Sequence, residues 1–124
     1  MIIEDEAFVS WLLSDILTSH GCIVVGSAAK LDQALAMISD ADFDFAVVDV
    51  NLNGVCSYPA ADMLEARRIP FVFSTGYGRQ GLEPAYQRFA VIQKPFGEQD
   101  LLAVLKDLLR PGDAPRNGSV AGGR

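Results

Sequence analysis

The sequence FDFAVVDVNLNG, residues 43–54, reads as a buried strand that ends on a carboxylate and runs directly into a turn. Apolar residues on both faces of this strand are typical of a parallel sheet that helices cover on both sides. Asp49 then lies at the carboxyl end of the strand, where such sheets bind their ligands. A lone strand-end aspartate also often does no more than cap a turn, so both interpretations of Asp49 stay open at this point.

Helical and strand patterns alternate on either side of this central strand. Helices are predicted at residues 7–19, 31–38, 60–67 and 98–109, and further strands at residues 1–3, 22–25, 70–74 and 91–93. Residues 76–90 are rich in glycine and proline and predict a loop with one weak helical turn. The pattern predicts an α/β fold, a doubly wound five-stranded parallel sheet in the flavodoxin-like order 2-1-3-4-5, with helices on both faces.

Composition indicates one domain and excludes several partners. The chain has 124 residues, half of them hydrophobic, which is enough to bury a core. We expect the domain to span residues 1–109 and residues 110–124 to form a disordered tail. A formal net charge of −6 argues against nucleic acid, and no apolar run approaches a membrane span. Cys22 and Cys56 lack any metal-ligand spacing, which favours free thiols in a reducing, cytoplasmic compartment.

Acidic residues gather at one edge of the predicted sheet. In this strand order the first and third strands are neighbours, so Glu4, Asp5 and Asp49 should share one pocket. Clustered carboxylates repel one another and are retained mainly where a cation neutralises them. Hard oxygen ligands suit Mg²⁺. The alternative is that residues 4–6 form only a solvated acidic run at a helix start.

Two further residues lie at the ends of the fourth and fifth strands. Thr75 and Lys94 would point into the same crevice as Asp49. An aspartyl carboxylate can attack a phosphoryl group if a cation, an ammonium and a hydroxyl offset the charge of the transferred oxygens. Taken singly, Lys94 is more often a surface lysine and Thr75 more often bonds backbone. The bond between Lys94 and Pro95 is a candidate cis peptide bond that would fix where the lysine points.

Over residues 1–109 the chain resembles a response-regulator receiver domain. Its motifs occur in the expected order: Glu4-Asp5, Asp49, Thr75 and Lys94-Pro95-Phe96. Residues 73–77, FSTGY, are similar to the Phe-Ala-Thr-Gly motif of single-domain alphaproteobacterial receivers. The resemblance implies that Asp49 accepts phosphate from the phosphohistidine of a sensor histidine kinase. It also implies that Gly76 is the small residue that leaves the phosphate accessible.

The same resemblance implies roles for the neighbouring residues. It predicts a Mg²⁺ site formed by Asp5, Asp49 and the backbone carbonyl of Asn51, with Glu4 acting through water, and phosphoryl contacts from Thr75 and Lys94. The chain also departs from the family. The first strand is short, which suggests a late start codon or a trimmed N-terminus. Val91 stands where receivers often carry a switch aromatic, and Tyr77, Tyr86 or Phe89 are the candidates to replace it.

The leading hypothesis is a stand-alone response regulator in a phosphorelay, which contacts a downstream regulator protein or drains phosphate from its kinase and is not a turnover enzyme. Whether it forms a homodimer is left open. The first alternative is a pseudo-receiver adaptor that binds a partner protein through its last helix without phosphorylation. The second is a phosphatase with an aspartyl nucleophile, which is disfavoured because position 51 is asparagine and not a second acid.

Overall fold

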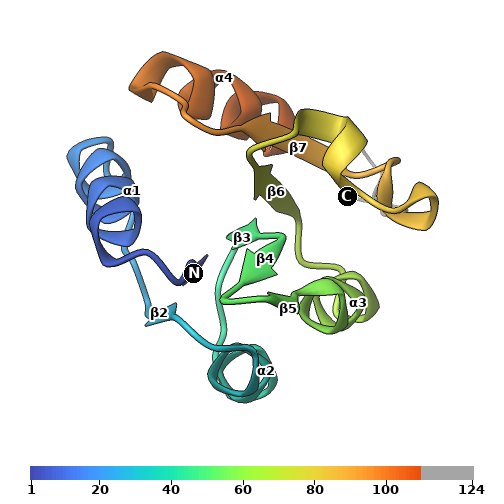
Figure 1. Cartoon of the computed structure of the whole chain (residues 1–124). Coiled ribbons are helices and arrows are strands. Elements are labelled where there is room, and N and C mark those ends of the chain that lie inside the picture. The colour runs from blue at the N-terminus through green and yellow to red at the C-terminus, as the bar shows by residue number, and fades with distance from the viewer. Residues whose placement is uncertain (110–124) are drawn as a thin grey trace.

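The computed structural model describes residues 1–109 and shows a five-stranded parallel sheet between two helical layers (Figure 1). The sheet contains β1 (Ile2–Ile3), β2 (Ser27–Ala28), β3 (Ala46–Asp49), β6 (Phe71–Thr75) and β7 (Ala90–Gln93). Its strand order is β2-β1-β3-β6-β7, with every neighbouring pair parallel. The predicted fold class and strand order are therefore confirmed. The tail predicted at residues 110–124 lies outside the described residues.

Within residues 1–109, four α-helices cover the sheet, two on each face. They are α1 (Ala7–Ser19), α2 (Leu31–Asp40), α3 (Tyr58–Ala66) and α4 (Glu98–Leu108). Figure 1 shows α1 and α4 on one side of the sheet and α2 and α3 on the other. In the part of the chain that is described, no helix is long and apolar enough to cross a membrane.

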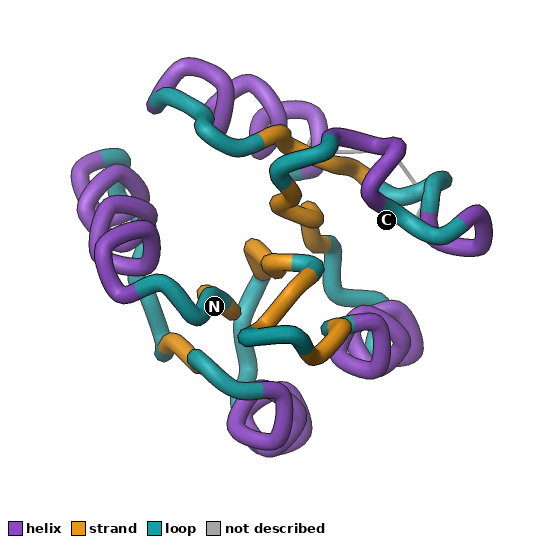
Figure 2. The backbone as a smooth tube through the Cα atoms, viewed as in Figure 1, coloured by secondary structure: helices purple, strands orange, loops and turns teal. Residues whose placement is uncertain are grey.

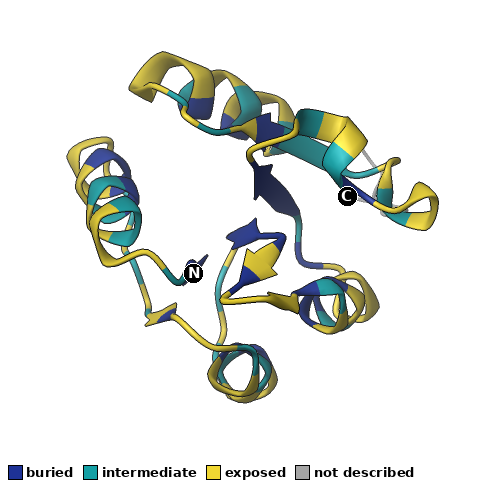
Figure 3. Cartoon of the chain, in the orientation of Figure 1, coloured by how far each residue is buried: buried dark blue, intermediate teal, exposed yellow. Residues whose placement is uncertain are grey.

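Successive residues of the central strands pack into two separate cores, one on each face. Val47 and Val72 belong to the core under α1 and α4, whereas Val48 and Phe73 belong to the core on the opposite face. All residues of β3 and β6 are buried, as Figure 3 shows by the dark blue of both strands. This burial explains why the sequence of the third strand is apolar on both sides. Asp49 and Thr75 are the polar residues that end these buried strands.

The second strand is not where the sequence pattern predicts it. Residues 22–25 are not a strand, and β2 forms only at Ser27–Ala28 (Figure 2). The reason is the register of β1 against β2. Ile2 of β1 pairs with Ser27, so residues 22–25 lie beyond the start of β1 and have no partner strand on that side. Ile23 is consequently 87% exposed, although its type favours a strand interior.

Two loops contain more structure than the sequence predicts. The turn after Asp49 is a small antiparallel hairpin of β4 (Asn51–Leu52) and β5 (Val55–Cys56), with Asn53 and Gly54 at positive φ. Residues 76–90 contain two 3₁₀ turns, η1 (Gly78–Gly81) and η2 (Pro84–Tyr86), where one helical turn is predicted. Leu82 between them is 3% exposed and anchors the segment to the core.

Candidate functional site

Three carboxylates meet at the carboxyl end of the sheet. Glu4 and Asp5 follow β1, and Asp49 ends the neighbouring strand β3. One carboxylate oxygen from each of the three residues lies within 4.8 Å of the others. Glu4 and Asp49 are only 3% and 6% exposed, so solvent would screen a negative charge on either carboxylate poorly. The structure thus brings together the acidic residues that the strand order predicts to share a pocket.

The ammonium group of Lys94 is the cation that faces these carboxylates. Its Nζ donates to Asp49 Oδ2 at 2.9 Å and lies 3.1 Å from Glu4 Oε1. Glu6 Oε1, on the solvent side, lies 3.5 Å from the same nitrogen. Lys94 follows β7, its own N–H donates to Thr75 O at 2.8 Å, and its bond to Pro95 is cis, as predicted. Lys94 is therefore engaged with the carboxylate cluster and is not a free surface lysine.

Electrostatics at this cluster favour a neutral Glu4 beside a charged Lys94. Burial, with a further contribution from the neighbouring Asp49 carboxylate, raises the pKa of Glu4 to about 8. Burial alone would lower the pKa of Lys94, but the hydrogen bonds and negative charges of Asp49 and Glu4 outweigh it and raise that pKa. One ammonium thus does not fully compensate the charge of the buried acids.

The Glu4 carboxylate also provides a test of whether the site fits a metal ion. Glu4 Oε1 is buried and, within residues 1–109, makes no hydrogen bond, although it lies close to Lys94 Nζ. A buried carboxylate oxygen without a hydrogen bond costs free energy unless another ligand satisfies it. The residues present, three acids whose hard oxygen donors lie close together and face a single ammonium, fit Mg²⁺.

Backbone groups of the hairpin fix the orientation of two of the acids. The N–H of Asn51 donates to Asp49 Oδ1 at 3.1 Å, and the N–H of Asn53 donates to Asp5 Oδ2 at 3.0 Å. The Asn51 side chain in turn accepts from the N–H of Gly54 at 2.6 Å, which closes the turn. Asn51 therefore shapes the loop with its side chain and holds Asp49 with its backbone.

Thr75 ends β6 beside this cluster, but its side chain makes a local bond. Its Oγ1 accepts from the N–H of Tyr77 at 3.2 Å, and no described contact joins it to Asp49 or Lys94. Gly81 of η1 packs directly on this hydroxyl, since a Cβ on Gly81 would come within 2.6 Å of it. The 3₁₀ segment is thus in contact with a predicted phosphoryl-binding group.

The candidate switch aromatics occupy different environments. Tyr77 is 80% exposed, whereas Phe89 is partly buried and packs on Phe71 and Phe73 at the edge of the core. Tyr86 stacks on Tyr58 of α3 at 4.0 Å between ring centroids. Val91 packs against the same core. Of the three candidates, Tyr86 is the one that connects the 3₁₀ segment to a helix, because its hydroxyl also donates to Asp62 of α3.

Sequence reasoning missed two residues of this region. Glu6 contacts Lys94, and the continuation of the acidic run past Asp5 was the only signal for it. Ser74 is paired in register with Asp49 and is 1% exposed. Its signal is the serine that replaces alanine in the Phe-Ala-Thr-Gly motif.

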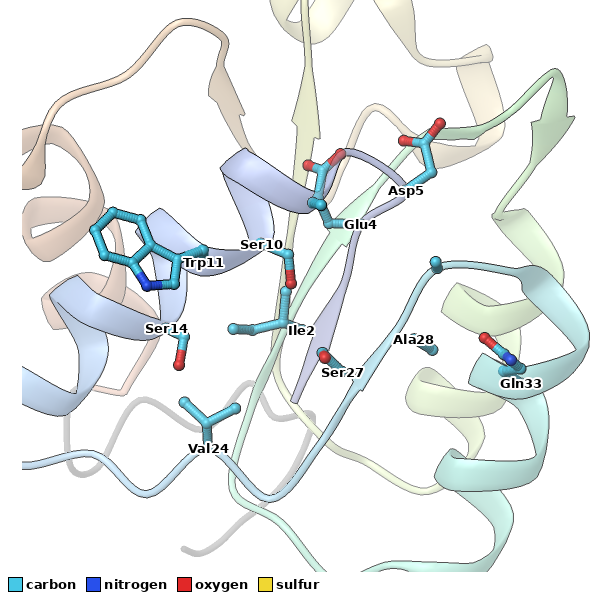
Figure 4. A pocket seen from close by; sticks show the side chains of 12 residues that line it. Ile2, Glu4, Asp5, Ser10, Trp11, Ser14, Val24, Ser27, Ala28 and Gln33 are labelled. Atoms are coloured by element: carbon cyan, nitrogen blue, oxygen red, sulfur yellow. The ribbon is translucent and has the colours of Figure 1, made fainter.

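A shallow groove of about 480 Å³ begins beside the acidic pair. Figure 4 shows Glu4 and Asp5 at one end and the side chains of Trp11, Ser14 and Val24 further along. The groove runs between α1 and residues 24–29 and does not include Asp49 or Lys94. It is therefore adjacent to the carboxylate cluster and not part of it.

Comparisons with known proteins agree with this architecture. The family model of the response regulator receiver domain matches residues 1–106. The sequence of SdrG from Sphingomonas melonis Fr1 is 38% identical to this chain. Its solution structure matches with a TM-score of 0.78 over 87% of this chain and 92% of that one. The receiver domain of PhyR from Erythrobacter litoralis is 25% identical, with a TM-score of 0.80 over 96% and 95% of the two chains.

A curated relative is longer than this chain. The transcriptional regulatory protein TcrA of Mycobacterium tuberculosis is 29% identical over 130 residues, which cover 99% of this chain but 50% of that protein. The chain thus spans about half the length of the curated relatives that it matches.

Proposed function

This chain belongs to the response regulator receiver domain family, and from that premise we propose that it accepts a phosphoryl group on Asp49 from the phosphohistidine of a sensor histidine kinase. The observation that carries the proposal is the geometry of one carboxylate. Asp49 Oδ1 is held by the N–H of Asn51, and Oδ2 is held by the ammonium of Lys94. A carboxylate fixed at both oxygens, 6% exposed at the end of a strand, is oriented for reaction.

The chemistry is a transfer between two nucleophiles. An oxygen of Asp49 forms a bond to phosphorus while the bond from phosphorus to the histidine nitrogen breaks, and the electron pair returns to the imidazole. Lys94 then pairs with the phosphoryl oxygens in place of the carboxylate oxygen that now bridges to phosphorus in the acyl phosphate. Thr75 reaches the same oxygens once its hydroxyl leaves the N–H of Tyr77.

The residues that would hold Mg²⁺ are Asp5, Asp49 and the backbone carbonyl of Asn51, with Glu4 acting through water. When bound, Mg²⁺ supplies positive charge that offsets the charge of the phosphoryl oxygens. The loop bonds of Asn51 and Asn53 keep two of these ligand residues in place. The phosphoryl group leaves Asp49 by transfer or hydrolysis, so the chain does not act as a turnover enzyme in this proposal.

The signal then passes on by contact with a downstream regulator protein, or the chain drains phosphate from its kinase. Both outcomes use the same site, and phosphorylation-dependent homodimerisation is compatible with either. A comparison of kinase phosphorylation with and without excess chain, in the presence of Mg²⁺ and ATP, separates them. A sink lowers the phosphate on the kinase without any partner protein.

The test of the phosphoacceptor is covalent labelling. Incubation with acetyl phosphate and Mg²⁺ should add one phosphate, measured by intact-protein mass spectrometry, and Asp49→Ala should abolish the addition. Asp40→Asn, which changes an exposed acid at the end of α2, serves as the matched control and should label normally. Labelling that survives in the Asp49 variant would overturn the proposal and leave the phosphorylation-independent adaptor as the better description.

A further inference from the structure

Ser74 carries a buried hydroxyl that has no hydrogen-bond partner among the described residues. Its side chain is 1% exposed, and Oγ neither donates nor accepts a bond. Only its backbone is engaged, because Ser74 O accepts from the N–H of Val50 at 3.0 Å. An unsatisfied buried hydroxyl destabilises the fold, and alanine of almost the same size would avoid this cost. A serine at this position therefore needs an explanation.

The register of the sheet places this hydroxyl beside the phosphoacceptor. Ser74 pairs with Asp49 on one side and with Ile92 on the other. Residues paired across neighbouring strands project from the same face of a sheet. Val47 and Val72, two residues before Asp49 and Ser74 on their strands, both pack into the core under α1 and α4, which confirms this face. The side chains of Asp49 and Ser74 thus stand side by side.

The ion pair between Lys94 and Asp49 spans β6, the strand that carries Ser74. Strand β6 lies between β3 and β7, yet Lys94, which follows β7, reaches Asp49 at the end of β3 with 2.9 Å between Nζ and Oδ2. Lys94 is two residues beyond Ile92 and therefore on the face that carries Ser74. The lysine side chain must cross β6 above residue 74. A small side chain such as that of serine leaves room for the lysine there and adds a polar group.

We propose that the Ser74 hydroxyl is a catalytic group of this site, which donates a hydrogen bond to the Asp49 carboxylate oxygen that Lys94 releases when the phosphoryl group is present. The inference rests on the proposed phosphorylation of Asp49. Strands in a sheet are about 4.8 Å apart, so a rotation of the serine side chain is enough to bring Oγ to a carboxylate oxygen of its paired neighbour.

This bond acts on the loss of the phosphoryl group. In hydrolysis, a water oxygen bonds to phosphorus, the bond from phosphorus to the Asp49 oxygen breaks, and the electron pair returns to the carboxylate. Water loses its proton to the solvent, and inorganic phosphate leaves. A carboxylate oxygen is a stronger hydrogen-bond acceptor than the bridging oxygen between carbon and phosphorus in an acyl phosphate. A donor at Asp49 therefore stabilises the transition state more than the phosphorylated ground state, and Ser74 shortens the lifetime of the phosphoprotein.

The experiment compares four proteins after labelling with acetyl phosphate and Mg²⁺ and removal of the donor. Loss of phosphate from wild type, Ser74→Ala, Ser74→Thr and Ser57→Ala is followed by intact-protein mass spectrometry. We expect Ser74→Ala to lose phosphate about fivefold to tenfold more slowly, the effect of one hydrogen bond in the transition state. Ser74→Thr keeps the hydroxyl and should stay within about twofold of wild type.

Ser57→Ala is the matched control, because Ser57 is the other serine of the described chain with a buried, unpartnered Oγ and it lies at the start of α3. Its lifetime should not change. Equal lifetimes for Ser74→Ala and wild type, or equal slowing in Ser57→Ala, overturn the role of Ser74 while leaving the phosphoacceptor intact. Failure of wild type to label at all overturns the proposed function, and the role of Ser74 with it.

Discussion

Lys94 Nζ and Asp49 Oδ2 lie 2.9 Å apart although their strands are separated by β6 and their positions by 45 residues. This contact joins the residue after β7 to the end of β3. Lys94 also contacts Glu4, which follows β1. Its partners are mostly buried, with 8% of the Asp49 side chain and 21% of the Lys94 side chain exposed. Loss of Lys94 would leave buried carboxylates without their cation, so this ammonium bears on stability as well as on the proposed chemistry.

Replacement of Lys94 by methionine should destabilise the metal-free protein by about 2 kcal/mol or more, because it leaves buried carboxylates without their cation. Methionine keeps the unbranched apolar stem, so the loss reports mainly on the charge. Urea unfolding in EDTA measures the change. Lys106→Met, at an exposed lysine of α4, is the control and should change stability by less than about 0.5 kcal/mol. Equal effects at both lysines would mean that the ammonium of Lys94 does not compensate the buried acids.

Removal of one carboxylate should have the opposite effect. Asp49→Asn lowers the repulsion among Glu4, Asp5 and Asp49 and should raise the melting temperature of the metal-free protein. Mg²⁺ should raise the melting temperature of wild type, since it binds the folded form, and should have little effect on the variant. Differential scanning fluorimetry over a Mg²⁺ titration measures both.

The Mg²⁺ titration has a matched control in the same loop. Asn51→Ala keeps the backbone carbonyl and the N–H that holds Asp49, and loses only the side-chain bond to Gly54. It should therefore retain Mg²⁺ binding within a few-fold, even if the loop is less stable. A loss as large as that of Asp49→Asn would mean that the Asn51 side chain contributes to the site directly.

Stability of the metal-free protein should depend on pH through Glu4. Its pKa is raised to about 8 in the folded protein, from an ordinary value of 4.5. The folded state then binds more protons than the unfolded state between these values, so the contribution of Glu4 to stability falls as pH rises from about 4.5 to 8. Glu4→Gln removes this titration. The stability of wild type relative to Glu4→Gln, measured by urea unfolding in EDTA, should decline over pH 5.5–8.5, and a constant difference would contradict the raised pKa.

Sequence patterns predicted those parts of the site that follow from strand order alone. Glu4, Asp49 and Lys94 each lie at or just after a strand end, and the carboxyl ends of parallel strands meet whatever the details of packing. The position of Ser74 beside Asp49 depends on which residues are paired across the sheet. That requires the register of β3 against β6, which no local pattern contains. Sequence could bring the acids together but could not place Ser74 opposite Asp49 in the sheet.

The misplaced second strand has a related cause. Residues 22–25 have strand-forming side chains, but a strand also needs a partner, and β1 provides one only opposite Ser27 and Ala28. Local propensity was therefore overruled by the register of β1 against β2. The 3₁₀ segment shows the same dependence, because Tyr86 and Leu82 hold it through contacts with α3 and the core that the glycine-rich sequence does not indicate.

The last prediction concerns the short strand β1 (Ile2–Ile3). The α-amino group of Met1 donates to Phe45 O at 3.1 Å, and burial lowers its pKa. An engineered extension of three valines before Met1 should continue β1 between residues 23–25 and 43–45, satisfy their backbone groups and move the charged amine into solvent. We expect a gain of roughly 1 kcal/mol, or about 4–8 °C in Tm, together with slower amide hydrogen exchange at residues 23–25. A Ser-Gly-Ser extension of equal length should produce neither change. If both extensions behave alike, the absence of a strand at residues 22–25 has a cause other than the extent of β1.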